Sequence, residues 1–337
     1  MIRSDETIPI PYAAGVSLCL EITQNYQDLP LPRVTAASIT RILDITMSSA
    51  MCVTITLDSG QDIHAVLKLY DRQFNVDLRD YRGIHMPLTT AKQTLFESFI
   101  RRNAIGPFLA QLAQYQEREL VPIQPHHHLD DDNFEGSQKY KAALWKDCDD
   151  MFNCETKAYE LLKDLQGTGV PRLLAAIRLV DTSPSIPSDL IGGPDAKYWD
   201  VNGILLQFIP GINLINLDSS SIDVREWPIL VQRSVDLVYK INEYGVVMMD
   251  CSPRNVIHEM KMWEPSNEQE DEEDEEKESE EKEEEDSEID LEAEYWNRVA
   301  SADNPGAIGC VMSMRLQREK GVKIMVQYPD IYGRPPE

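Results

Sequence analysis

The chain has 337 residues and a hydrophobic fraction of 42%, enough to bury a full core in one or two domains. No apolar run of about 18 residues predicts a membrane span, and the first residues lack a secretory signal, so we expect cytoplasmic or nuclear localisation without a membrane partner. The net charge is −26, of which −18 falls within Glu264–Glu294, and no basic stripe is visible, so nucleic acid is not an expected partner.

The first elements expected along the chain are strands. Val16–Ile22 is a short strand-like run, and Ser38–Leu57 is β-branched and alternating, which predicts two strands with a turn near residues 48–50. After a turn at residues 58–62, His64–Tyr70 predicts another strand. Lys68 interrupts this apolar strand. A buried lysine requires an anionic partner, whereas a lysine at a strand edge can extend its ammonium group to solvent.

Helical spacing occurs both within and after residues 71–150, a segment that we interpret as an insertion. Lys92–Gln116 has this spacing and is broken near Gly106-Pro107, and Cys154–Leu165 predicts a second helix that ends before Gly167. Glu155 lies at the rim of the apolar stripe of this helix, where it can point inward and pair with Lys68. The alternative is a glutamate favoured at that position by the helix dipole.

The strands expected next are Ala175–Val180 and Asn202–Ile209, and a helix is expected over Arg225–Glu243. That helix leads into the stretch YGVVMMDCSPRNVI, in which Asp250 and Asn255 have the spacing D-x-x-x-x-N. In phosphoryl transfer, an aspartate can accept the proton of an attacking hydroxyl, and an asparagine can offer its oxygen to magnesium. The alternative interpretation of this spacing is an ordinary surface turn.

This stretch resembles the catalytic loop of protein-kinase-like folds, H-R-D-x-x-x-x-N or H-G-D-x-x-x-x-N, with Met248 and Met249 in place of the first two residues. The phrases SPRNV, VLKLYD and LKDLQGTGVPRLLA resemble short kinase-like proteins of filamentous fungi, and the resemblance covers residues 39–312. It implies an α+β, two-lobed protein-kinase-like fold with a truncated C-terminal lobe. The implied domains are an N-terminal extension (1–37), a small lobe (38–209) with the insertion, and a truncated large lobe (210–337) containing a disordered acidic run (267–288).

The resemblance also implies site residues and cofactors. Lys68 would hold the ATP phosphates, Glu155 would orient Lys68, Asp250 would be the catalytic base, and Asn255 would be a magnesium ligand. The backbone near residues 207–209 would contact adenine.

Two departures from the family pattern weaken the expected activity. The first hairpin has no glycine to let its backbone approach phosphate. The D-F-G segment is missing, since only nine residues separate Asn255 from Pro265, although Glu259, Glu264 or Asp290 could replace its aspartate and a missing exon would also explain the gap.

The interpretation favoured by these departures is a pseudokinase that binds ATP weakly. The alternatives are an active phosphotransferase acting on protein Ser/Thr or small-molecule hydroxyls, and an interaction protein whose acidic run binds an unidentified protein partner.

Overall fold

The structure is a computed structural model that describes residues 6–81, 84–116, 125–129, 134–180, 187, 190, 192–259 and 305–328. The acidic run 267–288 lies outside these residues, as do Glu264 and Asp290. The chain divides into two compact units, Met1–Phe208 and Ile209–Glu337.

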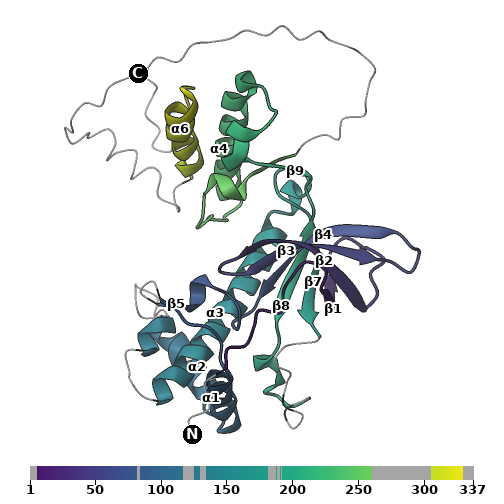
Figure 1. Cartoon of the computed structure of the whole chain (residues 1–337), viewed down its shortest axis with the longest axis vertical. Coiled ribbons are helices and arrows are strands. Elements are labelled where there is room, and N and C mark those ends of the chain that lie inside the picture. The colour runs from purple at the N-terminus through teal and green to yellow at the C-terminus, as the bar shows by residue number, and fades with distance from the viewer. Residues whose placement is uncertain are drawn as a thin grey trace, which may run out of the picture. The chain divides into compact units, whose positions relative to one another are not determined.

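A closed antiparallel β-barrel of six strands forms the centre of the first unit (Figure 1). Around the barrel the order is β1-β2-β3-β4-β8-β7. The strands are β1 (Ser17–Asn25), β2 (Val34–Ile45), β3 (Ser49–Thr56), β4 (Asp62–Tyr70), β7 (Leu173–Leu179) and β8 (Asn202–Gln207).

The predicted two-lobed protein-kinase-like fold is wrong, because the strands close into this barrel. Closure depends on β1, which pairs with β2 on one side and with β7 on the other. The sequence predicted most of these strands, including the hairpin of β2 and β3, but alternation reveals only which residues face inward and not which strands meet.

Alternate residues of the strands fill the barrel interior. On β4, Ala65, Leu67 and Leu69 are buried within the barrel core, while Val66 and Tyr70 belong to a separate apolar cluster that includes residues of the long helix α3 (Phe134–Leu161). Because side chains alternate along a strand, Lys68 shares the outer face of the barrel with Val66 and Tyr70.

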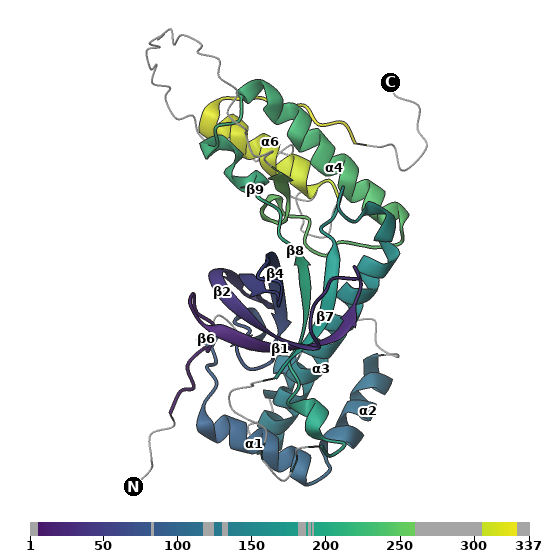
Figure 2. The same cartoon turned by 90° about the vertical axis from the view of Figure 1, so that its right-hand side faces the viewer.

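Two further helices, α1 (Thr90–Arg101) and α2 (Ile105–Gln116), lie against α3 (Figures 1 and 2). The predicted break near Gly106-Pro107 falls earlier, at residues 102–104. Pro107 lies in the first turn of α2, where a proline costs no intrahelical hydrogen bond. The first unit also contains a short pair of strands, β5 (Asp80–Tyr81) and β6 (Ile84–His85).

The second unit has its own core, formed by α4 (Trp227–Glu243) and α6 (Ala307–Lys320), which pack together. The helix expected over Arg225–Glu243 corresponds to α4. A two-stranded sheet of β9 (Gly211–Asn213) and β10 (Ile257–Glu259) belongs to this unit. Only glycine fits at position 211, because an added Cβ would lie 2.2 Å from the backbone oxygen of His258.

Candidate functional site

An ion pair on the outer face of the barrel joins Lys68 of β4 to Glu155 of α3. The Nζ atom of Lys68 lies 2.5 Å from Oε2 of Glu155. The two side chains are 28% and 26% exposed, so both remain reachable from solvent. The structure therefore forms the pair that the sequence predicted, across a gap that α1, α2 and most of α3 fill.

Tyr70, which sequence reasoning missed, completes this group. Its hydroxyl donates a hydrogen bond of 2.5 Å to the same oxygen of Glu155, and its ring centroid lies 5.7 Å from Nζ of Lys68. Burial, reinforced by the Glu155 carboxylate, raises the pKa of the Tyr70 hydroxyl well above its ordinary value, so the hydroxyl stays protonated and donates. Its position two residues after Lys68, on the same strand face, was the available sequence signal.

The residues in the turn between β2 and β3 are poorly suited to contact a phosphate group through their backbone. Its connection is Thr46-Met47-Ser48, with side chains at every position, and the carbonyl of Met47 accepts a hydrogen bond of 2.7 Å from Asn75. A Cβ atom on each turn residue hinders the close backbone approach that glycine allows.

Asp250 and Asn255 lie in a loop of the second unit, and Asn255 is the last residue of a 3-10 turn at Pro253–Asn255. The Asn255 amide donates to the backbone oxygen of Asp250 at 3.0 Å, and the Asp250 carboxylate pairs with Arg254 at 2.8 Å. Cys251, between them, is buried in the core of the second unit and anchors the loop. Arg254 was also missed, although its i+4 spacing from Asp250 is a usual ion-pair spacing.

The geometry of this loop suits a proton acceptor better than a metal site. The Asp250 side chain is 42% exposed and accessible to a hydroxyl. A magnesium ion requires several hard oxygen ligands, whereas Asp250 already has a guanidinium partner and Asn255 adds one amide oxygen. Glu259 is exposed on β10. Within the part of the chain that the structure describes, no group of three or more His, Cys, Asp or Glu could hold a metal ion.

The predicted site residues thus form two groups. Lys68 and Glu155 meet in the first unit, and Asp250 and Asn255 are hydrogen-bonded in the second. The predicted adenine contact at residues 207–209 begins at Gln207. The backbone N–H of Gln207 donates a hydrogen bond to the backbone oxygen of Arg172, and its side-chain oxygen accepts one from the backbone N–H of Arg172.

In comparisons with known proteins, no family model matches this chain, and no curated protein shows significant sequence similarity to it. Among the helices of the described residues, none is both long and apolar enough to cross a membrane.

Proposed function

We propose that the protein binds ATP weakly and has degenerate phosphotransferase chemistry, with Lys68 as the phosphate contact and Glu155 as the residue that holds Lys68. The observation that carries this proposal is the ion pair of 2.5 Å between them. A strand lysine that is fixed by a helix glutamate and still exposed to solvent presents its ammonium group in a defined direction, as an anionic ligand requires.

Two observations support weak rather than strong binding. The hairpin of β2 and β3 has no glycine at its turn, which limits backbone contacts with phosphate. The oxygens near Asn255 fit magnesium poorly, and phosphoryl transfer depends on a metal to neutralise charge on the phosphates.

An active phosphotransferase is the second candidate, and the exposure of Asp250 favours it. A carboxylate that is 42% exposed can reach the hydroxyl of a protein or small-molecule substrate and accept its proton. In that case Asp250 is the base, and its pairing with Arg254 orients the carboxylate.

The test is a thermal-shift titration of the full chain with ATP, with and without magnesium. We expect a small rise in Tm that depends little on magnesium. Lys68→Met removes one charged contact, worth about 1.5–3 kcal/mol, and should weaken ATP binding roughly 10- to 100-fold. Lys157→Met is the matched control, because Lys157 is an exposed lysine of the same helix as Glu155.

Two results would contradict the proposal. Equal ATP affinity in the wild type and Lys68→Met would remove Lys68 from the site. Robust transfer of phosphate to an acceptor, abolished by Asp250→Asn, would show an active enzyme in place of a degenerate one.

A further inference from the structure

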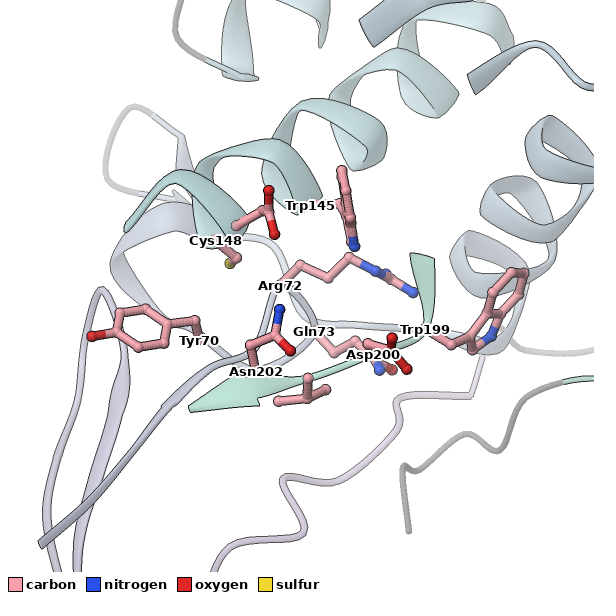
Figure 3. A pocket seen from close by; sticks show the side chains of 10 residues that line it. Tyr70, Arg72, Gln73, Trp145, Cys148, Trp199, Asp200 and Asn202 are labelled. Atoms are coloured by element: carbon pink, nitrogen blue, oxygen red, sulfur yellow. The ribbon is translucent and has the colours of Figure 1, made fainter. Parts of the chain in front are cut away.

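A small cavity in the first unit lies beside α3, between the segment that follows β4 and the residues that precede β8. Its walls include Arg72, Gln73, Trp145, Trp199 and Asp200 (Figure 3). The volume open to the centre of a water-sized molecule is about 10 Å³, which is room for a single small occupant. Figure 3 shows the side chain of Arg72 extending across this cavity.

The Arg72 guanidinium is buried and forms no ion pair with any described carboxylate. The residue is 5% exposed, and its Nη2 atom has no hydrogen-bond partner within the described part of the chain. Its Cζ atom lies 3.8 Å from the ring centroid of Phe96, which gives a cation–π contact. A buried charge is costly unless an opposite charge is close.

Trp199 supplies a second unused donor at the same cavity. The residue is 1% exposed, and none of the described residues accepts a hydrogen bond from its indole Nε1–H. The ring centroids of Trp199 and Phe96 are 5.8 Å apart, and Phe96 is also the ring that Arg72 contacts. The side-chain oxygen of Gln73 is likewise buried and has no partner in the described residues. The two ends of an amide can exchange places, so Gln73 can also present its donor end.

The carboxylates near Arg72 are weak counter-ions for it. Asp71 accepts hydrogen bonds from the Tyr12 hydroxyl at 2.6 Å and from the Gln73 backbone at 2.8 Å. Burial raises the pKa of Asp71, whereas these two hydrogen bonds and the charges of Arg72 and Arg79 lower it. A second buried guanidinium, Arg79, lies in the same segment, and its Nη2 atom also has no hydrogen-bond partner among the described residues.

The two acids that line the cavity are also engaged elsewhere. Asp200 pairs with Arg178 at 3.2 Å, and Asp149 accepts a hydrogen bond of 3.2 Å from Asn153. Burial raises the pKa of Asp149, and the neighbouring Asp150 adds to this effect. Arg72 and Trp199 both line this cavity, and each has a buried N–H donor that no described residue accepts.

We propose that this cavity binds a monovalent anion of halide size, held by the Arg72 guanidinium and the Trp199 indole N–H. Chloride is the expected occupant, because the volume admits one small ion and excludes phosphate-sized groups. Anion binding supplies the missing counter-charge and satisfies both donors, so it stabilises the folded first unit by mass action.

The experiment measures the Tm of the full chain in chloride and bromide against gluconate at constant ionic strength, together with the chlorine NMR line width. We expect halides to raise Tm and the protein to broaden the chloride signal. Trp199→Phe keeps an aromatic ring at this position but removes one N–H donor to an anion, so halide affinity should fall about tenfold or more. Arg72→Met should abolish the effect.

Trp145→Phe is the matched control. Trp145 lines the same cavity, but its indole N–H already donates to the backbone oxygen of Lys197 at 3.3 Å, so halide affinity should not change. Equal Tm values in halide and gluconate would overturn the proposal, and so would equal losses of halide affinity in Trp199→Phe and Trp145→Phe. Either result would mean that the cavity holds water rather than an anion. Trp199→Phe decides the question even if Arg72→Met does not fold.

Discussion

At the scale of single residues, one carboxylate oxygen organises the candidate phosphate contact. Oε2 of Glu155 accepts from Lys68 and from Tyr70, each at 2.5 Å. The Tyr70 ring is fixed in turn by burial and by an edge contact with Phe152 of α3, at 5.8 Å between ring centroids. Tyr70 therefore positions Glu155, and Glu155 positions Lys68, so the direction of the ammonium group depends on a hydroxyl that no phosphate would touch.

Tyr70→Phe tests this chain of contacts. The substitution keeps the ring but removes one hydrogen bond to a carboxylate, so we expect a loss of roughly 1–2 kcal/mol in the free energy of unfolding. We also expect a smaller ATP-induced rise in Tm, because Glu155 is held less firmly. Denaturant unfolding and the ATP titration measure these two effects separately.

The matched control is Tyr159→Phe on α3. Within the described residues the Tyr159 hydroxyl makes no hydrogen bond, although burial, and next the Glu155 carboxylate, raises the pKa of Tyr159. This variant should therefore retain the wild-type response to ATP. If both phenylalanine variants behave alike, the hydroxyl of Tyr70 does not position Glu155.

The residue types at the candidate site could be predicted only in part. Lys68 was detectable because a lysine interrupts an apolar strand, and Glu155 because it borders an apolar helix stripe. The cavity at Arg72 gave no comparable signal. Arg72 follows β4 in a polar segment that composition assigns to the surface, and its burial depends on Phe96, which lies far along the chain on α1.

At the scale of elements, the long helix α3 carries a cluster of acidic residues on a partly buried surface. The sequence predicted only its C-terminal end, because Asp147, Asp149 and Asp150 obscure the apolar periodicity upstream. Burial, and next the charge of Asp150, raises the pKa of Asp147 to about 6. The helix therefore holds a carboxylate whose charged form is disfavoured in the folded state.

Asp147→Asn should remove a pH dependence of stability. Because the folded-state pKa lies above the unfolded value of 3.8, the folded state binds more protons, and the Asp147 contribution to stability falls as pH rises from about 4 to about 6. At pH 7 the variant should be more stable than the wild type by roughly 1–2 kcal/mol, and at pH 4 the two should converge. Denaturant unfolding across this range measures the difference, and a constant difference at every pH would contradict the argument.

At the scale of the whole molecule, the sequence predicted the strands and helices better than it predicted that the strands close into a barrel. The outer face of β4 and its partner helix followed from periodicity. The barrel did not, because its closing pair joins β1 to β7, more than a hundred residues apart. Pairing over such a separation depends on packing of both faces rather than on any local pattern.

The apolar clusters of the first unit are separate from the core of the second unit, which predicts unfolding that is not two-state. Leu67 is fully buried inside the barrel of the first unit, and Leu316 is fully buried against α4 and its neighbours in the second. Truncating a buried leucine to alanine costs about 2–5 kcal/mol through lost burial and the cavity that remains. Leu67→Ala should therefore lower the temperature of one calorimetric transition, and Leu316→Ala should lower the temperature of the other.

The control for both variants is Leu161→Ala, since Leu161 is 46% exposed at the end of α3 and leaves no enclosed cavity. It should change the free energy of unfolding of each unit by less than about 1 kcal/mol. Each core variant should leave the transition of the other unit in place, because substitutions without shared neighbours act independently. A single transition that both core variants lower together would mean that the two cores unfold as one cooperative unit.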